Sequence, residues 1–239
     1  MLPAISFLKG VSLSNLLQIS QEMLRMYRER SGDPAFWAEP FNALTNASFL
    51  IAAGFALALA IRRQALTTST LTLISLAGVI GCGSFVFHTM PSPLTKWLDI
   101  IPITLFQILF TWLISCKLLS NRWISAGIVI VVVGASFALL PFHQPINGSL
   151  FYMPSLAAMV AFGGLWASRS NEEPFLLMGT ACCFAIAITA RTSDWSVPWP
   201  IGTHFLWHLL NGIVVYLALR TWIIATISHR FSEKGRILS

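Results

Sequence analysis

Seven apolar runs, each close to 20 residues long, constrain this chain more than any other feature of its sequence. They fall at roughly 42–61, 69–88, 97–116, 123–142, 150–168, 174–190 and 203–222. An α-helix of about 20 apolar residues is long enough to cross the hydrocarbon core of a bilayer. Charged residues make up 10% of the sequence, against about 25% in a soluble domain, and hydrophobic residues make up 56%. The sequence therefore predicts an all-α membrane protein, folded as a seven-transmembrane helix bundle.

Two shorter segments flank the predicted bundle, which we place at residues 37–226. Residues 1–36 are predicted to be an N-terminal interfacial segment, because Ser12–Arg30 mixes apolar and polar residues as an amphipathic surface helix does. Residues 227–239 form a basic tail. We see no second globular domain.

The basic residues predict how the bundle is oriented. Nine of the 15 Lys and Arg residues fall on the side that holds the C-terminus, and the positive-inside rule makes that side cytoplasmic. The N-terminus is then outside. The excess of six positive charges needs no nucleic acid, since it lies in loops without a basic-aromatic stripe. We expect a multi-pass protein with no obligatory protein partner, in the inner membrane if the source is bacterial.

Three histidines are candidate metal ligands. His204 and His208 are four residues apart, so both imidazoles lie on one face of a helix and can bind one ion. Ionisable residues inside membrane helices are costly and are usually functional. His88 completes a three-histidine set, which leaves one tetrahedral position open. Zinc suits such a site best, although iron and manganese stay open.

Counting the spans predicts that these residues share one side of the membrane. His88 ends the second span, Asp99 begins the third, and His204 and His208 begin the seventh. In a seven-span bundle these ends all lie on the non-cytoplasmic side. The candidate residues are therefore expected at one depth.

Three other polar residues have more than one interpretation. Asp99 is a fourth ligand, a carboxylate that orients a histidine, a general base, or an aspartate that caps the third span. Ser84, one turn before His88, donates to a developing oxyanion or packs between helices. Asn211, seven residues after His204, orients a ligand or lines the pocket.

These residues resemble a known family. Ser84-x-x-x-His88, followed by Asp99 and by His204-x-x-x-His208, is similar to the pattern of the alkaline ceramidases and of the wider CREST superfamily of seven-helix membrane hydrolases. The stretch Trp37–Asn46 resembles the start of that family's first span, and Gly202–His208 resembles its bacterial branch. The similarity covers nearly the whole chain.

The resemblance implies a zinc-dependent amidase. It assigns zinc to His88, His204 and His208, and catalysis to Ser84 and Asp99. Water activated by the zinc, with help from Asp99, would attack the N-acyl carbonyl of ceramide or a ceramide-like lipid. The products would be a sphingoid base or another amine and a free fatty acid.

A calcium site is expected to be incomplete. Animal members of the family bind calcium through an acidic cluster, and only Glu39 clearly matches that cluster here, with Glu29 as a second candidate. Arg25, Arg28 and Arg30 stand in that region, and hard cations need several oxygen ligands.

Two other functions stay open at this point. One is a non-catalytic, receptor-like member of the same superfamily, in which zinc holds the bundle together. The other is a bis-histidine haem protein that carries electrons. The haem interpretation leaves Ser84, Asp99 and the third histidine without a role.

Overall fold

The computed structural model describes residues 21–142 and 148–237, and within these ranges it is entirely helical. The main helices are α3 (Pro40–Thr45), α4 (Ala47–Arg62), α5 (Thr68–Thr89), α6 (Pro93–Leu119), α7 (Arg122–Ala138), α8 (Met153–Arg169), α9 (Leu176–Thr192) and α10 (His204–Ile237). Two 3₁₀ turns, η1 (Leu140–Phe142) and η3 (Ser149–Tyr152), lie between α7 and α8. Each predicted span corresponds to one helix of this set, and α3 with α4 together form the first.

Five helical segments are long and apolar enough to cross a membrane. They are Pro40–Arg62, α5, α6, Ser149–Arg169 and His204–Ile227. The helices α7 and α9 are apolar but have 17 residues each. Large apolar side chains such as Phe55, Trp123 and Ile130 face outward and are at least 65% exposed, as lipid-facing side chains are. The chain is a membrane protein.

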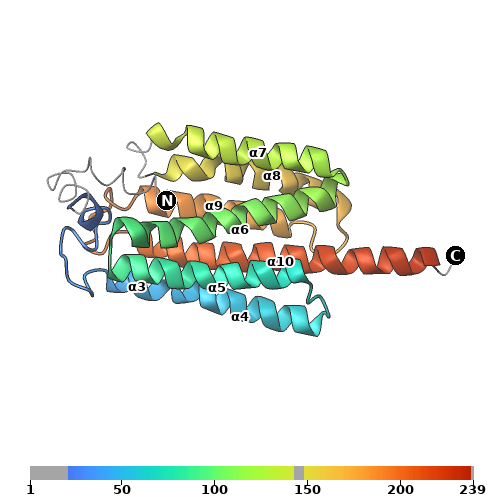
Figure 1. Ribbon diagram of the computed structural model, residues 1–239, viewed down its shortest axis with the longest axis horizontal. Helices are drawn as coiled ribbons and strands as arrows, with labels where there is room; N and C mark the ends of the chain where they lie inside the picture. Colours follow the sequence, from blue (N-terminus) through green and yellow to red (C-terminus); the bar gives the residue numbers. More distant parts are fainter. Residues whose placement is uncertain (1–20, 143–147, 238–239) are drawn as a thin grey trace, which may run out of the picture.

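The helices form a closed bundle around α10 (Figure 1). Each of α4 to α9 contacts the next helix along the chain, and α10 contacts α9, α4, α5 and α6. In the most apolar stretch of α10, 61% of the residues are buried inside the bundle. The corresponding stretches of the other four membrane-capable segments are only 33% to 44% buried. α10 is therefore the central helix, and polar residues on it are enclosed by its neighbours.

A tight turn places the end of α5 beside the start of α6. Only Met90, Pro91 and Ser92 separate the two helices. Ser92 caps α6 by accepting a hydrogen bond from the Thr95 backbone N–H, and the Thr95 hydroxyl accepts one from the Ser92 backbone N–H. Pro93 then occupies the first turn, where its missing N–H costs nothing. This connection brings His88 and Asp99 to the same end of the bundle.

The two flanking segments differ from what the sequence predicts. Most of the predicted interfacial helix lies outside the described residues, but the described part is helical only over residues 21–24 and then turns. Tyr27 and Arg30, which follow, are buried against the bundle. At the other end, α10 continues beyond the predicted limit at residue 222 and projects past the other helices (Figure 1). No proline interrupts this stretch, so the basic segment extends the last helix.

Candidate metal centre

His88, His204 and His208 meet in the buried end of the bundle. Their exposed fractions are 0%, 1% and 2%. Each histidine has one ring nitrogen that could bind a metal, and these three nitrogens all lie within 4.8 Å of one another. His204 and His208 come from adjacent turns of α10, and His88 comes from the last turn of α5. The structure thus brings together the three histidines that the sequence proposes as ligands.

The surroundings of the three rings fit a metal ion. The His88 Nδ1 atom lies 2.6 Å from Glu39 Oε2, and the His208 Nδ1 atom lies 3.1 Å from the Thr45 hydroxyl. Such contacts fix the orientation of a ligand ring and leave its other nitrogen for the metal. His88 Nε2 and His204 Nδ1 are buried, and neither has a hydrogen-bond partner among the described residues. Buried polar atoms are normally satisfied, and a cation held by the three rings would satisfy these two.

A haem group does not fit between these rings. The ring centroid of His88 is 4.8 Å from that of His208 and 5.2 Å from that of His204. The third pair, His204 and His208, is 4.7 Å apart. A macrocycle between two axial ligands would have to pass through the remaining histidine. The geometry therefore disfavours the electron-carrier interpretation.

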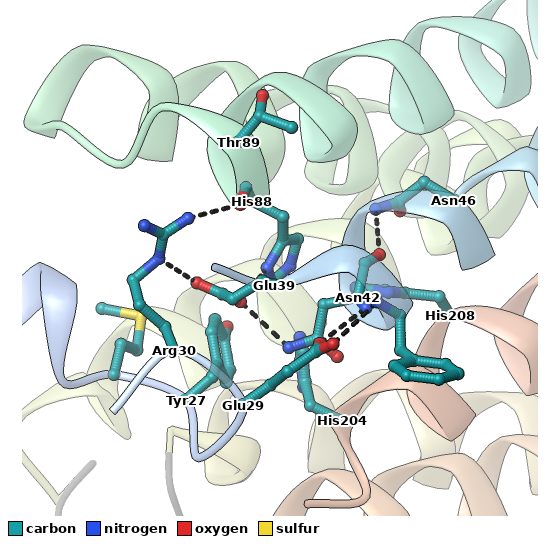
Figure 2. A network of polar contacts seen from close by, with 12 residues as sticks. Tyr27, Glu29, Arg30, Glu39, Asn42, Asn46, His88, Thr89, His204 and His208 are labelled. Atoms are coloured by element: carbon teal, nitrogen blue, oxygen red, sulfur yellow. Dashed lines mark hydrogen bonds and ion pairs between the residues drawn. The ribbon is translucent and has the colours of Figure 1, made fainter. Parts of the chain in front are cut away.

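A buried ion pair holds Glu39 against His88 (Figure 2). The Arg30 Nε atom lies 2.6 Å from Glu39 Oε1, and both side chains are almost fully buried. The other Arg30 nitrogens donate to the backbone oxygens of Asp33, Ala35 and His88 at 2.7 to 2.9 Å. Burial by itself raises the pKa of the Glu39 carboxyl, but the contacts with His88, Asn42 and Arg30 outweigh it, so that this pKa is lowered overall.

Both glutamates considered as calcium ligands are engaged in hydrogen bonds. Both oxygens of Glu39 accept hydrogen bonds, from Arg30, Asn42 and His88. Both oxygens of Glu29 accept backbone N–H groups at the start of α3, those of Phe41 and Asn42. Calcium needs six to eight oxygen ligands with free lone pairs. The hydrogen bonds of Glu29 and Glu39 are therefore consistent with an incomplete calcium site.

Asp99 and Ser84 face each other because α5 and α6 touch at Gly83. A Cβ atom added at Gly83 would overlap the Leu98 carbonyl group and lie 3.6 Å from the Asp99 backbone nitrogen. The Asp99 carboxyl lies close enough to the Ser84 side chain and to His88 to interact with both. Ser84 is 3% exposed, and Asp99 is half-buried. A hydroxyl and a carboxylate therefore stand beside the histidine cluster.

Gly83→Ala is expected to destabilise the bundle by about 1–3 kcal/mol, because the new methyl group must push α6 away from α5. The same shift separates Asp99 from Ser84, so activity should fall as well. Gly54→Ala is the matched control, since nothing lies within 4 Å of a Cβ at that position. Unfolding in detergent measures both variants, and an equal effect of the two substitutions would contradict the contact.

Tyr27 from the N-terminal segment, Arg191 from the end of α9 and Asp194 from the α9–α10 loop complete the site. The Tyr27 ring stacks on His204 with centroids 3.7 Å apart, and Arg191 Nη1 donates to the Tyr27 hydroxyl at 3.1 Å. Asp194 Oδ1 accepts the backbone N–H groups of Thr203 and His204 at 2.8 Å each, which caps the start of α10. The Tyr27 contacts join residues more than a hundred positions apart, whereas the Asp194 contacts lie within the connection from α9 to α10.

Asn211 lines a cavity inside the bundle. Its Nδ2 atom donates to the Trp207 backbone oxygen at 2.8 Å. Its side chain lines a mainly apolar cavity of about 70 Å³ within the bundle, together with Trp207, Ile80 and Ile103. Asn211 thus lies at the boundary between the histidine cluster and this cavity.

The fold and the site define a helical membrane protein with a buried three-histidine cluster beside a carboxylate. A family model described as Ceramidase matches residues 34–176. The match covers more than half of the chain, which therefore belongs to the ceramidase family, a family of hydrolases of sphingolipid metabolism. The matched stretch contains Glu39, Ser84, His88 and Asp99, and it ends before the two histidines of α10. No curated protein and no solved structure matches the chain significantly.

Proposed function

We propose that this protein is a zinc-dependent amidohydrolase that cleaves the N-acyl amide of ceramide or a ceramide-like membrane lipid. The observation that most strongly supports this proposal is the buried histidine cluster, whose potential ligand atoms lie within 4.8 Å of one another. Its position beside the Asp99–Ser84 pair supports the same proposal. Family membership supplies the reaction class.

His88, His204 and His208 would hold the zinc ion. Three neutral imidazoles leave one coordination position open, as in other catalytic zinc sites. When bound, zinc supplies Lewis-acid activation of water and of the amide carbonyl. Glu39 and Thr45 orient His88 and His208 through their Nδ1 atoms, so that the Nε2 atoms are directed to the ion.

Asp99 and Ser84 would carry out the proton and charge steps. Asp99 accepts a proton from the attacking water and later delivers one to the leaving nitrogen. Ser84 donates a hydrogen bond to the carbonyl oxygen as negative charge develops on it. The C–N bond breaks, the acyl group leaves as a fatty acid, and the other product is a sphingoid base or another amine.

The cavity beneath the site is suited to a hydrocarbon chain. Each of three helices contributes one lining residue a single turn from a candidate site residue: Ile80 lies four residues before Ser84, Ile103 four after Asp99, and Asn211 three after His208. Most of the remaining lining is aromatic or aliphatic. A lipid chain in this cavity would hold its polar linkage at the histidines.

The proposal includes the full topology. All seven long helices would cross the membrane, since 17 residues are at the lower limit for α7 and α9. The basic residues place the C-terminus in the cytoplasm and the N-terminus outside. The site, at the start of α10, then faces the non-cytoplasmic side.

Release of fatty acid from ceramide by the purified protein tests the activity. We expect cleavage that stops when a zinc chelator is added and returns with zinc but not with calcium. A protein that binds zinc but cleaves no lipid amide would be receptor-like, and that outcome would contradict the proposal. The calcium arm separately tests the assignment of Glu29 and Glu39 to hydrogen bonding.

A further inference from the structure

Besides Asn211, three polar side chains interrupt the apolar wall of the cavity. They are Gln107 and Thr111 of α6 and Ser155 of α8. The same three residues also line a second, much smaller hollow on the other side of the contact between α6 and α8. They therefore form a polar partition between two hollows inside a membrane bundle.

The hydroxyl groups of this partition are unpaired. Thr111 and Ser155 are each 8% exposed, and within residues 21–142 and 148–227 no hydrogen bond involves the side chain of Gln107, Thr111 or Ser155. Other helical threonines satisfy their hydroxyls locally: Thr104 donates to Ile100, Thr180 to Leu176 and Thr221 to Leu217, each four residues earlier. A hydroxyl that faces an apolar cavity without a protein partner is poorly solvated, so these groups are available to bind a polar group of a ligand there.

The partition lies at a fixed depth below the site. Gln107 and Thr111 follow Asp99 on α6 by eight and twelve residues, which at the rise of an α-helix is about 12 Å and about 18 Å. A chain that starts at Asp99 and descends through the cavity reaches the partition in its distal half. Polar side chains in membrane bundles often pair with one another between helices, but these three do not.

We propose that Gln107, Thr111 and Ser155 bind a hydroxyl group in the distal half of the substrate's acyl chain, so that amides of hydroxylated fatty acids are preferred. This inference rests on the proposed function, because it places the scissile amide at the histidine cluster. The bound hydroxyl donates to one partner and accepts from another, which satisfies the partition. A chain without the hydroxyl leaves those groups unpaired, and enzymes discriminate on that basis.

The test compares N-ricinoleoyl-sphingosine with N-oleoyl-sphingosine. The two acyl chains have the same length and the same double bond and differ by one hydroxyl in the distal half. We expect kcat/KM to be higher for the ricinoleoyl amide by about 5- to 10-fold, the value of one net hydrogen bond. Thr111→Val and Ser155→Ala should bring this ratio close to one, whereas Thr180→Val, outside both hollows, should preserve it. Equal kcat/KM values in the wild type would overturn the proposal, as would a ratio that Thr111→Val leaves unchanged.

Binding of the free acids separates failure of this inference from failure of the proposed function. We expect ricinoleic acid to raise the unfolding temperature of the wild-type protein more than oleic acid does, and Thr111→Val to abolish the difference. If this holds while neither amide is cleaved, the polar subsite stands and the proposed amidase activity fails. If both amides are cleaved but the two acids stabilise equally, the amidase stands and the subsite is wrong.

Discussion

Asp99→Asn is expected to lower amide hydrolysis by about 10²- to 10⁴-fold while the protein keeps its metal. Asparagine has the size and shape of aspartate and can still pair with Ser84, but it cannot take a proton from water. The substitution therefore removes the proposed base and leaves the histidines as they are. Steady-state rates with ceramide, measured beside the metal content of the same preparations, give both quantities.

The matched control for this substitution is Asp33→Asn. Asp33 is exposed, and its Oδ1 atom accepts the Ala35 backbone N–H at 2.8 Å, a contact that asparagine also makes. We expect near wild-type activity from this variant. Asp99→Asn with full activity would rule out Asp99 as the base, and loss of the metal from that variant would make Asp99 a ligand.

Arg30→Met is expected to destabilise the protein by about 3–5 kcal/mol, the cost of leaving a buried carboxylate without its partner. Methionine keeps much of the length of the arginine side chain but removes the charge and all four hydrogen bonds to Glu39, Asp33, Ala35 and His88. Activity should fall as well, since Glu39 would no longer be held against His88 Nδ1. Equilibrium unfolding in detergent measures the first effect, and ceramide hydrolysis measures the second.

An exposed ion pair in the same chain provides the control. Arg63 Nη2 lies 2.9 Å from Glu172 Oε1, and these two side chains are 42% and 40% exposed. Exposed pairs contribute about 0–1 kcal/mol, so Arg63→Met should have a small effect. If the two substitutions lowered the free energy of unfolding by similar amounts, the burial of the Arg30 ion pair would not be the reason for its contribution to stability. A conservative Arg30→Lys variant should recover only part of the loss, because lysine cannot match the planar fork of donors.

The sequence predicts the helices of this protein well because their signals are local. Run length and composition locate each apolar helix to within a few residues. The four-residue spacing predicts that His204 and His208 lie on one face of a helix. The count of spans predicts that His88 lies at the same end of the bundle. The family match confirms the predicted membership over residues 34–176. The bacterial branch, the site roles and the exact topology stay predictions.

The parts that the sequence does not predict depend on contacts between distant segments. Arg30 looks like a solvated charge on an amphipathic helix, yet it is buried because four oxygens converge on it, three from residues 33–39 and one from His88 at the end of α5. Tyr27 and Asp194 reach the start of α10 from loops, and no periodicity reports such contacts. The unpaired state of Thr111 is equally invisible, since other helical threonines in this chain bond to their own backbone.

The most direct test of the proposed function is the metal content of the purified wild-type protein beside that of His204→Ala, with ceramide hydrolysis measured on both. Circular dichroism checks that the variant keeps its helices. We predict about one zinc ion per chain in the wild type, with metal and hydrolysis lost together in the variant. A helical wild-type protein that takes up no zinc, or a His204→Ala variant that keeps both zinc and activity, would contradict the three-histidine site.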